Sequence, residues 1–267
     1  MSTGFFLGPK PRVFGHRGAA GLAPENTLPS FALGLALGAD VLELDVHATR
    51  DGAIVVIHDP TLERTTDGAG LVREHVLYDI QRLDAGFRFT RGAGDFSYRG
   101  QGICIPTLEA VFKQFPLAKC NIEVKADPPI VAQVVEIIRR FDAQHRVLLA
   151  AEDDSIMREI RRQAGDIATS FAAPEVADFI ARVQGGTLGG YRPAGRALQI
   201  PARFGDIELV TADTIAAAHR CGLEMHVWTI NERDEMDRLL ALGVDGIMSD
   251  LPGIARLAVD GGKARGV

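Results

Sequence analysis

Residues 40–59 read DVLELDVHATRDGAIVVIHD and contain two apolar, β-branched runs joined by Asp51-Gly52. An Asp-Gly pair between two such runs is typical of a two-residue hairpin turn. With these two residues as the turn, Arg50 would face Ala53 and Asp45 would lie opposite His58. The pattern therefore predicts that His58 returns by a hairpin to the acidic residues of the first run, instead of arriving on a barrel strand of its own.

Short apolar runs alternate with amphipathic segments along almost the whole chain. The predicted strands are 12–16, 40–46, 120–125, 146–151, 167–171, 197–200, 224–229 and 244–249. The predicted helices are 27–38, 107–115, 129–142, 153–164, 174–183, 211–221, 231–242 and 252–260. Eight strand–helix units require a parallel sheet, and eight parallel strands can close into a (β/α)₈ TIM barrel, an α/β fold. An open doubly wound sheet is the alternative, but no GxGxxG follows the first predicted strand.

The length of 267 residues suits one such barrel, so we expect a single domain over residues 1–267. Residues 47–106 would form the hairpin and a small, loop-rich insertion over the barrel mouth, where barrel enzymes build their sites. The Gly-rich stretch 185–195 leads into a strand, so it is expected to be a flexible connector on the opposite face. We assign no function to residues 172–195.

The composition excludes several classes of protein. The net charge of −6 argues against a nucleic-acid partner, because nucleic-acid binders present a basic face. No stretch approaches the roughly 18 apolar residues of a membrane span, and no secretory signal is visible, so we expect a cytoplasmic protein without stable membrane insertion. The three cysteines, Cys104, Cys120 and Cys221, fit no metal or redox spacing.

Three acidic residues stand at the ends of predicted strands. Glu43 and Asp45 are two residues apart and share one face of their strand, and Glu123 ends another strand with Lys125 on the same face. Oxygen ligands without cysteine favour Mg²⁺ or Ca²⁺ over zinc. The alternative is a buried ion-pair network in which Lys125 and Arg17 neutralise the acids.

Two of the seven histidines also stand at strand ends, His16 beside Arg17-Gly18 and His58 beside Asp59-Pro60. Two imidazoles on either side of a phosphate can serve as general base and general acid near neutral pH. The others are interpreted as core or surface residues, with a barrel-lining position open for the last: His47, His75, His145, His219 and His226.

The motifs, taken in order, resemble those of the glycerophosphodiester phosphodiesterase family. They are HRGAAGLAPENT, ELDVHATRDGAIVVIHDPTLERTTDGAG, IPTLEAV, NIEVK and HVWTINERDEM with LGVDGIMSDLP, spread from about Pro11 to Pro252. Ser249 and His47 depart mildly from the usual family pattern, and neither departure removes a catalytic group.

The resemblance implies a phosphodiesterase barrel with one divalent metal ion, Mg²⁺ or Ca²⁺, bound by Glu43, Asp45 and Glu123. It makes His16 and His58 the acid–base pair, without fixing which is acid and which is base. It places further groups in the substrate site: Arg17 and Lys125 on the phosphate oxygens, Glu25 nearby, and Trp228 as an apolar wall for glycerol.

The expected reaction is hydrolysis of a small-molecule glycerophosphodiester to sn-glycerol 3-phosphate and an alcohol. A lysophospholipase D activity on lysophospholipids is the alternative within enzymes, because a fold and a catalytic set do not fix the substrate. A catalytically inactive barrel that acts as a binding module is the alternative of another class. The sequence does not indicate the headgroup preference or the oligomeric state.

Overall fold

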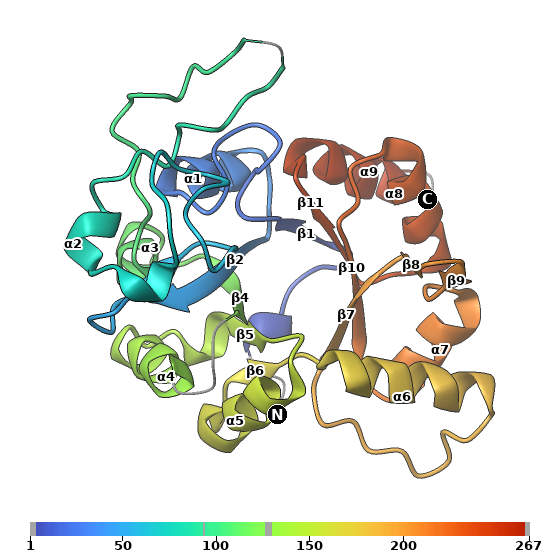
Figure 1. Ribbon diagram of the computed structural model, residues 1–267. Coiled ribbons are helices and arrows are strands. Elements are labelled where there is room, and N and C mark those ends of the chain that lie inside the picture. Colours follow the sequence, from blue (N-terminus) through green and yellow to red (C-terminus); the bar gives the residue numbers. More distant parts are fainter. Residues whose placement is uncertain (1–3, 93, 126–129, 265–267) are drawn as a thin grey trace.

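The computed structural model describes residues 4–92, 94–125 and 130–264, and its centre is a ring of eight parallel strands (Figure 1). The strands are β1 (Arg12–Gly15), β2 (Val41–Ala48), β4 (Lys119–Val124), β5 (Val147–Ala150), β6 (Ala168–Thr169), β7 (Ala197–Pro201), β10 (Glu224–Trp228) and β11 (Gly246–Ser249). Their order around the ring is β6-β5-β4-β2-β1-β11-β10-β7. An isolated parallel bridge between Ser170 and Ala197 joins the two ends. The prediction of an eight-stranded TIM barrel is confirmed.

Helices surround this ring on the outside, as Figure 1 shows. They are α1 (Leu28–Ala36), α3 (Leu108–Gln114), α4 (Val131–Arg140), α5 (Asp154–Ala164), α6 (Ala173–Gln184), α7 (Ala212–Arg220), α8 (Arg233–Leu242) and α9 (Pro252–Ala264). Hydroxyl and carboxylate caps start several of them: the Asp153 side chain, for example, accepts hydrogen bonds from the amides of Ser155 and Ile156 at the start of α5. The predicted start of one helix at residue 129 lies outside the described residues.

The predicted hairpin after the second strand forms, but its register was predicted wrongly. β3 (Ile54–Val56) pairs antiparallel with β2 so that His47 lies opposite Val55, and the Thr49 amide donates to the Ala53 carbonyl at 2.9 Å. Asp45 therefore lies opposite Ile57, whose amide donates to the Asp45 carbonyl at 3.0 Å, and not opposite His58.

The register shift comes from the turn, which contains three residues, 50–52, instead of two. Gly52 has a φ of 82°, and its amide donates to the Thr49 carbonyl at 3.0 Å. A glycine in the left-handed region at the end of a three-residue loop is the next most common way to close a hairpin. His58 still reaches the site, because it follows the end of β3.

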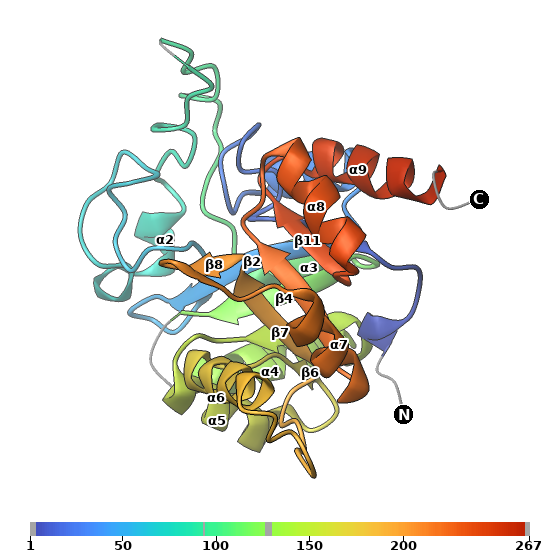
Figure 2. The same ribbon diagram turned by 90° about the vertical axis from the view of Figure 1, so that its right-hand side faces the viewer.

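The segment between the hairpin and α3 stands out from the barrel (Figure 2). It contains η2 (Val72–Glu74), α2 (Leu77–Ile80) and a small apolar core that includes Ile57, Leu62 and Ile105. In the same segment, the rings of Phe89 and Tyr98 pack edge to face with their centroids 5.3 Å apart. The Gly-rich stretch 185–195 connects α6 to β7, as expected for a loop on the face opposite the mouth.

A second hairpin was not predicted: β8 (Arg203–Phe204) and β9 (Ile207–Glu208) follow the carboxyl end of β7. Two-residue strands give no periodic signal, which is why the sequence did not reveal them.

The interior of the barrel is apolar in the middle and charged at both ends. Phe14, Leu148 and Met248 pack in the middle, and Phe5 and Phe6 of η1 (Gly4–Phe6) join this core. Below them lies an ion cluster of Lys10, Arg12, Glu224, His226 and Asp245. The carboxyl ends of the strands carry the second charged group, described below. Within the described residues, no helix combines the length and apolarity that crossing a membrane requires.

Candidate active site

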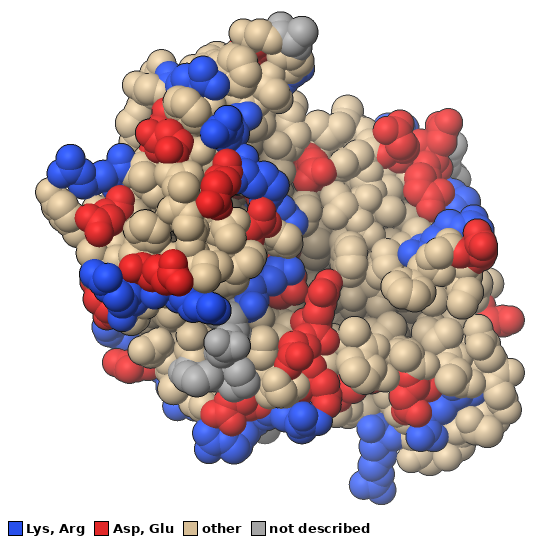
Figure 3. All heavy atoms as spheres, in the orientation of Figure 1, with Lys and Arg blue, Asp and Glu red and all other residues tan. Residues whose placement is uncertain are grey.

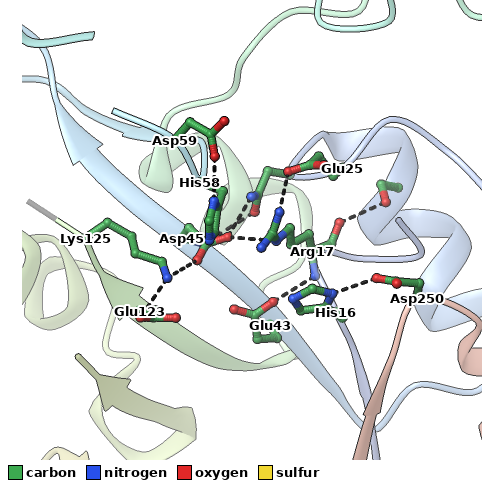
Figure 4. A network of polar contacts seen from close by, with 12 residues as sticks. His16, Arg17, Glu25, Glu43, Asp45, His58, Asp59, Glu123, Lys125 and Asp250 are labelled. Carbon is green, nitrogen blue, oxygen red and sulfur yellow. Dashed lines mark hydrogen bonds and ion pairs between the residues drawn. The ribbon is translucent and has the colours of Figure 1, made fainter. Parts of the chain in front are cut away.

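The carboxyl ends of the barrel strands bring most of the predicted site residues into one pocket. Its lining includes His16, Arg17, Glu43, Asp45, His58, Glu123, Lys125 and Trp228. Figure 4 shows how the acidic and basic side chains converge from β2, β4, the hairpin and the turn after β1. In the space-filling view, charged side chains of both signs border the hollow in this face (Figure 3). Glu25 is the exception, since it does not line this pocket.

Glu43, Asp45 and Glu123 present carboxylate oxygens within 4.8 Å of one another. Burial and the charge of Asp45 raise the pKa of Glu43 to about 8, and burial raises the pKa of Glu123 to about 7 despite the ammonium of Lys125. Three oxygen donors that repel one another in a buried site are a suitable ligand set for a hard divalent cation. The residues present therefore fit Mg²⁺ or Ca²⁺.

Arg17 and Lys125 pair with these acids only in part. Lys125 Nζ lies 2.8 Å from Glu123 Oε1 and 3.7 Å from Asp45 Oδ1, and Arg17 Nε lies 3.4 Å from Asp45 Oδ2. Glu43 instead accepts a hydrogen bond from the Arg17 backbone amide at 2.8 Å. An ion-pair network alone would leave Glu43 with a strongly raised pKa, so the two cations do not satisfy the acids by themselves.

The backbone conformation of Arg17, in the turn after β1, helps to place its side chain. The φ of Arg17 is 48°, which is uncommon for a residue other than glycine and is more frequent at functional sites. Arg17 Nη1 donates to Glu25 Oε1 at 2.8 Å, and Arg64 holds both oxygens of Glu25 at 2.7 and 2.8 Å. Glu25 is thus occupied by two arginines, and the structure places it as a support for Arg17.

His16 belongs to a chain of hydrogen bonds that runs to the end of β11. Its Nδ1 lies 2.6 Å from Asp250 Oδ1, and Asn231 Nδ2 donates to the other Asp250 oxygen at 2.7 Å. Burial disfavours the imidazolium, but the hydrogen bond to Asp250 and the charge of Glu43 outweigh it, and the pKa of His16 is raised. With Nδ1 engaged, Nε2 is the nitrogen left for proton transfer.

His58 has a similar carboxylate partner. Its Nδ1 lies 2.7 Å from Asp59 Oδ1, and Arg64 Nε donates to Asp59 Oδ2 at 2.6 Å. The hydrogen bond from Arg64 lowers the pKa of Asp59 to about 2. Both histidines are therefore oriented by an ionised aspartate, in the way that catalytic imidazoles commonly are.

These supporting residues were missed by the sequence reasoning: Asn26, Asp59, Arg64, Asn231 and Asp250. All of them lie within the motifs quoted above, and Asp250 directly follows a predicted strand. Its position at the end of a strand could have indicated a site residue, as the position of Glu123 did. Asn26, which donates to Asp45 Oδ2 at 2.9 Å, gave no such signal because its place depends on a loop with a φ of 57°.

A family model, curated relatives and solved structures match this chain. The model of the glycerophosphoryl diester phosphodiesterase family matches residues 16–254. The glycerophosphodiester phosphodiesterase of Caldanaerobacter subterraneus subsp. tengcongensis is 31% identical over 258 residues, which cover 91% of this chain and 95% of that protein. A lysophospholipase D of Mus musculus is 26% identical over 268 residues, which cover 90% and 83%.

Among solved structures, that of an Oleispira antarctica phosphodiesterase in complex with the product sn-glycerol-3-phosphate has a TM-score of 0.74 and 27% identity, and the match covers 94% of this chain and 97% of that one. The barrel and these matches define an enzyme that hydrolyses phosphoric diesters. The chain belongs to the glycerophosphoryl diester phosphodiesterase family.

Proposed function

We propose that this protein hydrolyses glycerophosphodiesters to sn-glycerol 3-phosphate and a free alcohol. One observation carries the proposal: two histidines, each backed by an aspartate, share a pocket with three clustered carboxylates, an arginine and a lysine. This set supplies the proton transfers and the charge neutralisation that a phosphodiester requires. The family match and the product complex of the Oleispira enzyme support the same reaction.

Glu43, Asp45 and Glu123 would hold one divalent ion, Mg²⁺ or Ca²⁺. When bound, such an ion supplies Lewis-acid stabilisation of charge on a phosphate oxygen and helps to orient hydroxyl groups of the substrate. Asn26 and Lys125 help to hold Asp45 in place, because Asn26 donates a hydrogen bond to Asp45 Oδ2 and the Lys125 ammonium lies near Asp45 Oδ1.

His16 and His58 divide the proton transfers between them. One imidazole takes the proton of the nucleophile, which in this proposal is the glycerol 2-hydroxyl, and the other gives a proton to the oxygen of the leaving alcohol. Water then opens the resulting cyclic phosphate to give sn-glycerol 3-phosphate. Asp250 and Asp59 fix the ring orientation of the two histidines and stabilise the protonated form that each adopts in turn.

Arg17 and Lys125 bind the charge that develops on the phosphate. The guanidinium offers a planar set of donors, and Glu25 and Asp45 hold it in one orientation. The Lys125 ammonium acts as a point charge next to Glu123. Trp228, at the end of β10, lines the pocket beside Met248 and provides an apolar wall for the carbon chain of glycerol.

A lysophospholipase D activity is the second candidate, and the unpredicted hairpin favours it. Phe204 and Ile207 are 72% and 54% exposed on β8 and β9, at the mouth end of β7. Such apolar side chains could contact the acyl chain of a lysolipid, and the match to the mouse lysophospholipase D points the same way. An inactive barrel is not favoured, because both histidines and all three carboxylates line the pocket.

The testing experiment measures release of glycerol 3-phosphate from glycerophosphocholine with Mg²⁺, with Ca²⁺ and with a chelator. Metal-dependent release is the expected result. A parallel assay measures choline released from lysophosphatidylcholine. If this substrate is hydrolysed faster than glycerophosphocholine, the lysophospholipase D activity is favoured instead. No hydrolysis of either substrate by the folded protein with any ion would contradict both.

A further inference from the structure

Two amide side chains from different strands lie at the floor of the active-site pocket. Asn121 lies on β4, two residues before Glu123, and Gln199 lies on β7, two residues before its carboxyl end. Both line the pocket together with Met248. Because inward-facing residues on a strand repeat every two positions, Asn121 lies one layer deeper in the barrel than Glu123.

Each amide has one polar atom without a hydrogen-bond partner among the described residues. These atoms are Asn121 Oδ1 and Gln199 Nε2, and the Asn121 residue is only 2% exposed. Buried polar atoms are nearly always paired in native proteins, because an unpaired one loses its hydration without compensation. A ligand that reaches the floor and pairs with both would remove that cost.

We infer that Asn121 and Gln199 bind the terminal hydroxyl of the substrate's glycerol moiety and thereby select glycerol phosphodiesters over diesters that lack it. One acceptor and one donor match a hydroxyl, which can donate one hydrogen bond and accept another. In the proposed function the phosphate lies among His16, Arg17 and Lys125, nearer the mouth, so the three-carbon chain would extend inward along Trp228. This inference rests on the proposed function. It places the glycerol moiety, which all the proposed substrates share, at the floor of the pocket.

A structural role for Gln199 makes a different prediction. Gln199 lies level with His226 on the neighbouring strand, and His226 Nδ1 also has no partner among the described residues. If a rotation of the Gln199 side chain paired these two groups, removing the amide would affect stability and would not change the discrimination between ligands.

The experiment compares two ligands and two variants. Glycerol 3-phosphate is matched with propane-1,2-diol 1-phosphate, which lacks only the terminal hydroxyl, and the inhibition constant of each is measured in the metal-loaded enzyme. The wild-type protein is expected to prefer glycerol 3-phosphate by roughly tenfold or more, since a missing hydroxyl leaves two buried groups unpaired. Gln199→Met and Asn121→Leu are expected to remove most of that preference, chiefly by lowering the affinity for glycerol 3-phosphate.

Three results would overturn the inference: equal affinity of the wild-type protein for the two ligands, an unchanged preference in folded variants, or failure of both variants to fold. The last would show that the amides hold the barrel together. The wild-type assay with glycerophosphocholine is independent of these results. If it shows no hydrolysis, the proposed function fails, whereas hydrolysis with unchanged ligand preference in the variants rejects only the roles of Asn121 and Gln199.

Discussion

At the scale of single residues, the site depends on the groups behind the two histidines. Asp250 holds His16 by Nδ1 and is itself held by Asn231, which also accepts from the Ser249 hydroxyl at 3.0 Å. Substitution of Asp250 by Asn keeps the shape and removes the charge. Because the imidazole then loses both its orientation and its electrostatic partner, we expect kcat to fall by roughly 10²–10⁴-fold with little change in KM.

This prediction is checked by steady-state kinetics with glycerophosphocholine, alongside His16→Ala and His58→Ala, which should lose roughly 10²–10⁴-fold in rate. Asp237→Asn is the matched control, since Asp237 pairs with Arg233 on the surface of α8. A folded Asp250→Asn protein with the kcat of the control would show that His16 needs no carboxylate partner.

The three carboxylates lead to a prediction at the same scale that does not depend on activity. Their mutual repulsion in the apo protein is relieved when a divalent cation binds, so saturating Ca²⁺ or Mg²⁺ should raise Tm by several degrees. Glu43→Gln should abolish most of the rise caused by the metal, because it removes one of the three carboxylate ligands. Calorimetry with and without a chelator measures both effects. Equal metal-induced shifts in the wild-type and variant proteins would argue against binding at these carboxylates.

At the scale of elements, the turns after the strands place the functional groups, and two glycines illustrate how differently such turns tolerate change. Gly18 and Gly52 both have positive φ, 94° and 82°. A Cβ on Gly18 would lie 2.5 Å from Ser30 Oγ and 2.8 Å from the Phe31 amide nitrogen, whereas one on Gly52 would approach only Gln133 Nε2, at 3.4 Å.

Gly52→Ala should therefore cost only the left-handed conformation, about 1–2 kcal/mol of unfolding free energy, and should leave activity unchanged. Gly18→Ala should cost more, about 3 kcal/mol or beyond, and should lower activity because α1 and the Arg17 backbone must separate. Urea unfolding and turnover measured for both variants test the pair. Similar losses from the two substitutions would show that the close packing of Gly18 against α1 is not important.

The elements also show what the sequence could and could not predict. Strand–helix alternation identified the barrel, and strand ends marked His16, Glu43, Asp45 and Glu123, because the carboxyl ends of parallel strands share one face. The hairpin register could not be obtained this way, since two-residue and three-residue turns both accept Asp-Gly with Gly52 at positive φ. The two turns differ at Asp51, which has a positive φ in a two-residue type I′ turn but not here. Supports such as Arg64 reach the site through loop geometry, which hydrophobic periodicity does not encode.

At the scale of the whole molecule, the barrel has charged groups at both ends, and they differ in how far they are satisfied. At the mouth, Glu43 and Glu123 have raised pKa values, because nearby cations neutralise the three carboxylates only in part. At the opposite end, Arg12, Lys10 and His226 surround Glu224, and Asp245 joins Lys10 to His219. Burial opposes ionisation of Glu224, but these partners outweigh it and lower its pKa to about 2. This ion cluster around Glu224 is therefore structural, and its contribution to the free energy of unfolding depends on pH.

The sign of that dependence follows from linkage. Glu224 has a folded pKa of about 2 against an ordinary value of 4.5, so its stabilisation is complete above pH 4.5 and is lost as the pH falls through 4.5 towards 2. Between pH 7 and pH 3 this group should account for about 2 kcal/mol of lost unfolding free energy. Glu224→Gln should be less stable than the wild-type protein at pH 7, because it leaves Arg12 buried without its anion, and should lose correspondingly less on acidification. Urea unfolding at the two pH values, with exposed Glu136→Gln as the control, measures the difference, and equal acid losses in the wild-type protein and Glu224→Gln would contradict it.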